Sequence, residues 1–176
     1  MSDILTKARP KKVRAVSSDY LHHRRPVPAE ITGSGVVNFY IHGPLKKDVH
    51  HAFTAANLVK LMEVGLPVRE LTVLQASLAL PVERLAPMLG ISKATFHRSK
   101  GTGSKLNPAV SDRVVRFARL LGQAVKVFGG LEDAKQWLNS PQFGLGGALP
   151  LDYAKTEIGV REVENLLGRI EYGVYT

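Results

Sequence analysis

Residues 92–100 hold the side chains best suited to chemistry in this chain of 176 residues, and that chemistry is hydrogen bonding to a polyanion. The segment reads SKATFHRSK, so hydroxyl, imidazole, guanidinium and ammonium groups follow one another closely. On a helix, the outward groups of such a segment can donate to phosphate oxygens or to base edges in a DNA major groove. The candidate DNA-binding residues are Ser92, Lys93, Thr95, His97, Arg98 and Lys100.

The spacing around this segment predicts a helix-turn-helix over residues 82–100. Ala86 is small enough for a second helix to cross closely, Gly90 suits the left-handed backbone of a tight turn, and Phe96 would face the core. Ser92 is a natural N-cap for the second helix. Pro87 removes a backbone donor from the first helix. An ordinary helical hairpin with a glycine turn is therefore the alternative interpretation.

The histidines do not predict a metal site. They lack acidic or cysteine companions at ligand spacing, so solvated loop positions are expected. The chain has no cysteine, which excludes thiolate catalysis and disulfides. We expect no metal, no cofactor and no catalytic residue. The six histidines are His22, His23, His42, His50, His51 and His97.

The glycines at 144, 146 and 147 do not predict a phosphate-binding loop. They follow no strand, and no Lys–Ser/Thr pair comes after them. We interpret them as turn formers that let Trp137, Leu138, Phe143 and Leu149 converge in a core.

The net charge of +9 is unevenly distributed. Residues 1–106 contain 16 Lys and Arg against 7 Asp and Glu, whereas residues 107–176 contain 8 of each kind. This division predicts a polyanionic partner for the first part and a different partner for the second. A basic surface that only keeps the protein in solution is the alternative.

The chain lacks segments that would direct it to a membrane. No apolar run approaches the roughly 20 residues of a membrane helix. No apolar segment follows the charged N-terminus, as it would in a signal peptide. We expect a cytoplasmic location, nucleoid-associated when the protein is bound to DNA, and no membrane partner.

Helices are expected from residue 54 onward. Thr54 can cap a helix that Gly65 ends, and Pro67 fits the first position of the next. Asn107 and Pro108 begin a long helix that Gly129-Gly130 stops, about 30 Å in length and able to link two lobes. The long helix has apolar positions at helical spacing, namely Val114, Phe117, Leu121, Val125 and Phe128.

The first 53 residues read as a basic, partly flexible arm. Residues 1–35 are polar, proline-punctuated and positively charged, which does not support a packed core. Contact with DNA and simple disorder are equally compatible with that composition. Residues 36–41 are β-branched and aromatic, so we predict a short strand there.

The C-terminal residues combine aromatic groups with charges. After a final amphipathic helix come large side chains that need burial inside the protein or on a partner. Closure of the protein's own core by Tyr172 and Tyr175 is the alternative to partner binding. The candidate partner-binding residues are Arg169, Glu171, Tyr172, Val174 and Tyr175.

From about residue 55 to the end, the sequence resembles antitoxins of the Xre/MbcA/ParS type, from the RES–Xre class of bacterial type II toxin–antitoxin pairs. The C-terminal part is the more specific. The segments that carry the resemblance are Ser111-Asp112-Arg113, Val127-Phe128-Gly129, Ala134-x-x-Trp137-Leu138-x-x-Pro141, Leu145-Gly146-Gly147-x-x-Pro150-Leu151-Asp152, Thr156-Glu157-x-Gly159 and Leu166 through Tyr175.

The resemblance implies an all-α fold in which an Xre-like helix-turn-helix domain is joined by a long helix to a small helical toxin-binding domain. It implies a RES-domain toxin, which consumes NAD or transfers its ADP-ribose, as the partner. The C-terminal domain would block the toxin's active site, and the helix-turn-helix would repress the shared operon. A homodimer and larger hetero-oligomers with the toxin would be the repressing species.

These expectations give three parts: an arm over residues 1–53, a helix-turn-helix domain over 54–106 and a toxin-binding domain over 107–176. A stand-alone transcriptional regulator with a ligand-sensing C-terminal domain is the second interpretation. An enzyme is the least supported, because no histidine follows residue 97 and the carboxylates show no pairing pattern.

Overall fold

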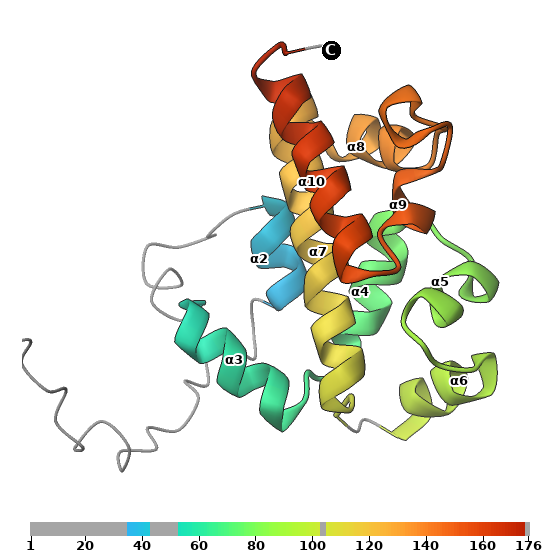
Figure 1. Ribbon diagram of the computed structural model, residues 1–176. Helices are drawn as coiled ribbons and strands as arrows, with labels where there is room; N and C mark the ends of the chain where they lie inside the picture. The colour runs from blue at the N-terminus through green and yellow to red at the C-terminus, as the bar shows by residue number, and fades with distance from the viewer. Residues whose placement is uncertain (1–34, 43–52, 103–104, 175–176) are drawn as a thin grey trace, which may run out of the picture.

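The computed structural model describes residues 35–42, 53–102 and 105–174, and every regular element within them is a helix (Figure 1). The predicted all-α fold is therefore confirmed. No helix in these ranges is both long and apolar enough to cross a bilayer. The elements are α2 (Val36–His42), α3 (Ala55–Val64), α4 (Arg69–Leu78), α5 (Val82–Met88), α6 (Lys93–Thr102), α7 (Pro108–Phe128), α8 (Leu131–Leu138), the 3-10 helix η3 (Phe143–Leu145), α9 (Pro150–Tyr153) and α10 (Glu157–Glu171).

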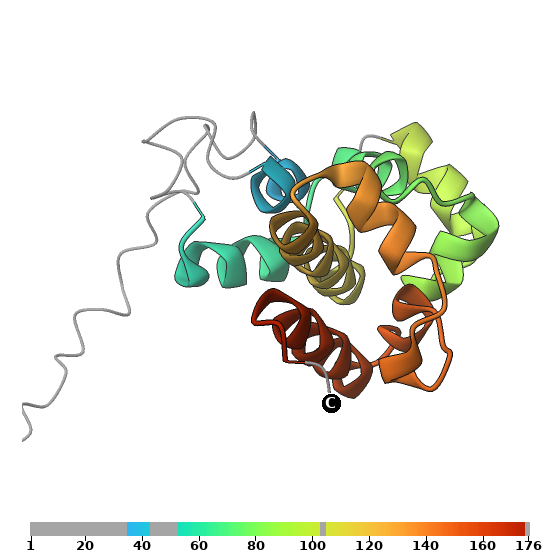
Figure 2. The same ribbon diagram turned by 90° about the horizontal axis from the view of Figure 1, so that it is seen from above.

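Helix α7 lies at the centre of the molecule. The side chain of Asn107 caps it by accepting a hydrogen bond from the Val110 amide at 2.8 Å, and Gly129 ends it in the left-handed conformation, as the sequence predicts. Seen from above, α7 runs between α2 on one side and α10 on the other (Figure 2). It also contacts α3, α4 and α8. Elements from both halves of the chain therefore pack on this one helix.

A single hydrophobic core surrounds α7. Leu71 and Leu85 from the first half belong to the same cluster of buried residues as Leu138, Val163 and Leu167 from the second half. The α7 side chains predicted to be apolar contacts take part, with Val114, Phe117 and Leu121 buried and Val125 and Phe128 partly buried. The two halves consequently share one folding core.

The predicted strand over residues 36–41 is wrong, because these residues form α2. Val36, Val37 and Ile41 are buried against α4 and α7. The amide of Val37 donates to a carboxylate oxygen of the buried Glu70 at 3.0 Å, which satisfies one of the free donors at the start of the helix. No strand among the described residues is available to pair with this segment, so packing and capping override its β-branched composition.

Close contact between α2 and α7 requires a glycine. A Cβ atom at Gly122 would overlap the carbonyl oxygen of Tyr40. The absence of that atom lets the two backbones approach. Burial of the Tyr40 side chain raises the pKa of its hydroxyl, although the charge of Arg119 opposes this shift.

The helix boundaries follow the sequence signals closely but not everywhere. Thr54 and Gly65 bound α3, as predicted. The next helix begins at Arg69 rather than at Pro67, and Pro67 lies instead in an isolated β-bridge with Lys105. Pro87 lies inside α5 without ending it, so this short helix tolerates the missing donor.

In the C-terminal half, Phe143 does not lie where the sequence predicts. Leu138 is buried and Trp137 packs against Phe128, with ring centroids 5.4 Å apart. Phe143 does not join them, since its side chain is 100% exposed. Leu145 is the buried anchor of the turn instead, so the expected convergence of Phe143 into the core is wrong.

Candidate functional site

Helices α5 and α6 form the predicted helix-turn-helix, with Gly90 in the left-handed conformation at φ 67° between them. Ser92 caps α6 as expected, because its Oγ accepts a hydrogen bond from the Thr95 amide at 3.1 Å. The Phe96 ring is buried, which fixes the rotation of α6 about its own axis. Lys93, His97 and Arg98 are consequently exposed on the outer face of the helix.

Two cations on this surface are already engaged. Lys93 pairs with Glu83 of α5 at 3.3 Å. Lys100 donates to the side-chain oxygen of Gln75 at 2.9 Å and lies 4.8 Å from the centre of the Phe96 ring. Lys100 is therefore turned partly toward the protein. Arg98 makes no ion pair with another described residue, so its guanidinium is available to a ligand.

Glu83 places a negative charge beside the recognition surface. Its pKa lies below the usual value, first because the carboxylate accepts a backbone hydrogen bond at the start of α5 and then because Lys93 is close. The carboxylate is therefore ionised at neutral pH, and it competes with any phosphate for Lys93.

The start of α7 holds the turn in place. Arg113 donates to the carbonyl oxygen of Leu89, the residue before Gly90, at 3.0 Å. The buried Ser111 hydroxyl accepts from the Leu66 amide at 2.9 Å and donates to the Asn107 carbonyl at 3.0 Å. Composition and periodicity do not identify these supporting residues, and only the family resemblance includes the segment Ser111-Asp112-Arg113.

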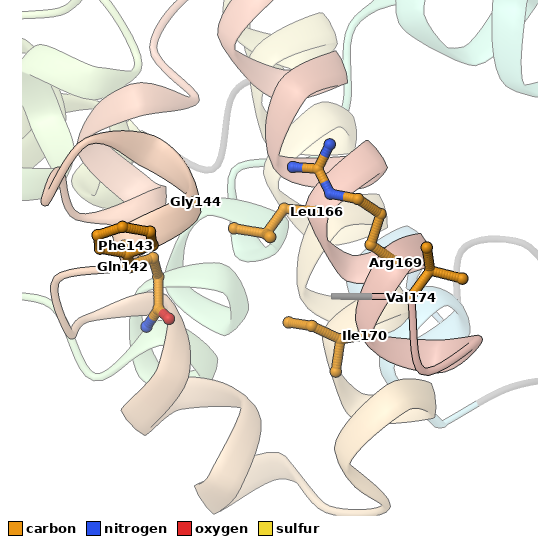
Figure 3. Close-up of a pocket in the computed structure, with 7 residues that line it drawn as sticks. All are labelled: Gln142, Phe143, Gly144, Leu166, Arg169, Ile170 and Val174. Atoms are coloured by element: carbon orange, nitrogen blue, oxygen red, sulfur yellow. The ribbon is translucent and has the colours of Figure 1, made fainter. Parts of the chain in front are cut away.

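A groove of about 410 Å³ opens on the opposite half of the chain, between η3 and the end of α10 (Figure 3). Figure 3 shows Phe143 on one side and Leu166, Ile170 and Val174 on the other. The lining is largely apolar and includes a single charged side chain. The lining residues are Gln142, Phe143, Gly144, Leu166, Arg169, Ile170 and Val174.

The structure brings only some of the predicted partner-binding residues to this groove. Arg169 and Val174 line it, whereas Glu171 pairs with Lys126 of α7 at 2.9 Å, a contact that raises the pKa of Lys126. Tyr172 is 80% exposed, so it does not close the protein's own core as the alternative interpretation would have it. Tyr175 lies outside the described residues.

Comparison with known proteins links these two surfaces to one family. Residues 58–119 match the model of the antitoxin Xre-like helix-turn-helix domain, and residues 123–173 match that of the antitoxin Xre/MbcA/ParS C-terminal toxin-binding domain. Antitoxin Xre of Yersinia enterocolitica is 31% identical over 68% of this chain and 81% of its own length. The chain belongs to the Xre family of antitoxins.

Other relatives agree with this assignment. Antitoxin Xre of Photorhabdus laumondii is 33% identical over 67% of this chain and 80% of its own length. A protein of a Sphingobium species named "Prs ADP-ribosylating antitoxin" is 27% identical over 66% of this chain and 79% of its own length. In this antitoxin, α6 falls within the DNA-binding match, and all residues that line the apolar groove except Val174 fall within the toxin-binding match.

A polar contact joins the two halves of the antitoxin at the surface. Arg84 of α5 donates to the side-chain oxygen of Asn139 at 2.8 Å and pairs with Asp152 of α9 at 3.3 Å. Asn139 also caps α8 by donating to the Lys135 carbonyl. The first helix of the helix-turn-helix is therefore fixed directly to the toxin-binding half.

The described part of the antitoxin contains no group of three or more His, Cys, Asp or Glu residues arranged to hold a metal ion. His97 is exposed on α6, and His42 ends α2. The remaining four histidines, at 22, 23, 50 and 51, lie outside the described residues.

Proposed function

We propose that this antitoxin neutralises a RES-domain toxin that consumes NAD or transfers its ADP-ribose, and that it does so by occlusion rather than by catalysis. The observation that carries the proposal is the exposed apolar surface at the end of α10, where the toxin-binding match ends. The name of the Sphingobium relative, an ADP-ribosylating antitoxin, supports ADP-ribose chemistry for the partner.

The proposed mechanism places residues 169–175 at the mouth of the toxin's NAD-binding cleft. Tyr172 and Val174 leave the last turn of α10 with their side chains exposed, so they are available as anchors. Arg169 makes no ion pair with another described residue and can meet a carboxylate of the toxin. Glu171 would have to leave Lys126 before it could mimic the anionic part of NAD.

Deletion of residues 170–176 tests this mechanism. The truncated antitoxin should remain folded by circular dichroism, because Tyr172 and Val174 are exposed. It should no longer inhibit the purified toxin or protect cells that express it. A truncated protein that stays folded and neutralises the toxin fully would contradict the mechanism.

We also propose that α6 represses the antitoxin's own operon by reading the operator. Lys93 and Arg98 are exposed, and their cationic side chains can donate hydrogen bonds to base edges or to phosphates. Replacing each with Ala should cost about 1–3 kcal/mol if it reads a base, and should lower the salt dependence of binding if it contacts phosphate. Unchanged operator binding by the double variant would show that another surface contacts DNA.

Repression is proposed to require a homodimer, and larger assemblies with the toxin, in the cytoplasm where the operator lies. One recognition helix contacts few bases, and two-fold symmetry is the usual remedy. The exposed face of α3 can form the contact between copies. Val59 and Val64 are 49% and 53% exposed, and Lys60 and Glu63 lie exposed between them.

The order of residues on α3 favours an antiparallel pair. When the segment from Val59 to Val64 is read in reverse, its apolar ends coincide and Lys60 exchanges places with Glu63. A two-fold axis between Leu61 and Met62 would therefore bring the lysine of one copy toward the glutamate of the other. Neither charge forms an ion pair with another described residue.

A further inference from the structure

Phe143 is an aromatic residue whose side chain is the most exposed of the large apolar side chains in the described part of the chain. Its side chain is 100% exposed, and it projects from η3 beside the groove (Figure 3). Exposed apolar groups that are clustered and adjoin a groove mark interaction sites more often than isolated ones do. Ile170 and Val174 extend the apolar surface across the groove.

The turn that presents Phe143 is held rigidly. The Gln142 side-chain amide donates to the carbonyl oxygens of Trp137 at 3.1 Å and Ser140 at 3.0 Å. The backbone amide of Gln142 donates to the Ala148 carbonyl at 3.1 Å. Leu145 anchors the turn in the core. Because the backbone is fixed before binding, little backbone conformational entropy remains to be lost when Phe143 enters a partner.

The groove itself depends on close contact between η3 and α10. A Cβ atom at Gly144 would lie 2.8 Å from a methyl carbon of Leu166, so the glycine allows the two elements to meet. Arg169 supplies the only charge along the lining. The surface can thus receive an apolar side chain that has a carboxylate nearby.

We propose that Phe143 inserts into an apolar pocket of the toxin while the groove receives an apolar side chain of the toxin, with a toxin carboxylate on Arg169. The inference rests on the proposed function and assigns affinity and inhibition to different parts of one surface. Phe143 and the groove, which includes Val174, supply the affinity, and Tyr172 just after α10 blocks the active site. The occupant is a protein rather than DNA, because the groove offers phosphates only one cation.

The test measures the dissociation constant between the full-length antitoxin and the purified RES-domain protein encoded beside it, made inactive by substitution. Phe143→Ala should raise the dissociation constant at least tenfold, as the loss of a central aromatic anchor does. Ile170→Glu should weaken binding by a similar factor, because it places a charge in the groove. Ile158→Ala, which changes an exposed apolar side chain at the start of α10 and away from the groove, is the matched control and should bind as the wild type does.

Folding and the proposed function are separated from the inference by two further measurements. Because the Phe143 side chain makes no buried contact, Phe143→Ala should keep the thermal midpoint of the wild type. Equal affinity of wild type and Phe143→Ala for the toxin would overturn the inference alone. Failure of the wild-type antitoxin to bind the RES-domain protein would overturn the proposed function, and the inference with it.

Discussion

At the scale of single residues, Ser111 illustrates how one hydroxyl supports the DNA-binding half. It is buried, accepts from the Leu66 amide and donates to the Asn107 carbonyl. Ser111→Ala would leave the Leu66 amide without a partner, and a buried unsatisfied donor costs about 1–3 kcal/mol. Urea denaturation should show a loss of this size in the free energy of unfolding.

The matched control for this prediction is Ser140→Ala. The Ser140 hydroxyl is exposed and bonds only to the Gln136 carbonyl of the preceding turn. Its removal should change the free energy of unfolding by less than about 0.5 kcal/mol. Equal effects of the two substitutions would show that burial of Ser111 does not matter to stability.

The charge of Glu83 should affect DNA affinity rather than stability. Its carboxylate lies beside α6 and holds Lys93. Glu83→Gln should release Lys93 and remove a charge that repels phosphate, so the dissociation constant for DNA should fall on the order of a few fold at low salt. Fluorescence anisotropy at two salt concentrations would measure this change.

Glu132→Gln provides the control for Glu83→Gln. Glu132 also pairs with a lysine, Lys135, but it lies on α8 in the toxin-binding half. This substitution removes the same negative charge, but at a position far from α6 in the sequence. An equal gain in DNA affinity would mean that net charge, and not the position of Glu83, controls binding.

Residue-level roles could be predicted where local backbone chemistry decides them. Gly90, Ser92 and Phe96 have the roles that their spacing predicts, because turn conformation, capping and burial follow from the neighbouring sequence. Phe143 could not be predicted in this way. Hydrophobicity favours burial, and only the packing of Leu145 in its place shows that Phe143 points outward.

At the scale of helices, α2 shows where local propensity fails. Its β-branched and aromatic residues predict a strand, yet Glu70 caps it and α7 covers it. Both partners are distant in sequence, so no local pattern contains the information. By contrast, α7 has its N-cap, its glycine stop and its apolar period within its own sequence, and was predicted correctly.

On α3, Lys60 and Glu63 would face each other across the proposed two-fold axis. Lys60→Glu should weaken the proposed homodimer, because it would place like charges opposite each other across the two-fold axis. The double variant Lys60→Glu with Glu63→Lys should restore it, since the pairing is only exchanged. Sedimentation equilibrium would measure the dimer dissociation constants. A double variant as weak as the single one would rule out this antiparallel arrangement.

At the scale of the whole molecule, the shared core predicts a single unfolding transition. Leu85 of α5 is fully buried in the same cluster as Leu138 of α8. Leu85→Ala should cost about 2–5 kcal/mol. The only tryptophan, Trp137, lies in the other half, yet its fluorescence should report the same lowered midpoint as circular dichroism. Two separate transitions would show that the halves fold independently.

The path of α7 also constrains how such antitoxins can acquire new partners. The DNA-binding match ends at residue 119 and the toxin-binding match begins at 123, so the junction falls inside an uninterrupted helix. Each residue advances a helix by about 100° and 1.5 Å. Gain or loss of one residue at the junction would turn the groove by that angle about the axis of α7, and so change its orientation relative to the recognition helix. Recombination between relatives could exchange the toxin-binding half and its specificity. The orientation of that half relative to the recognition helix would be kept only if the number of residues in α7 stayed the same.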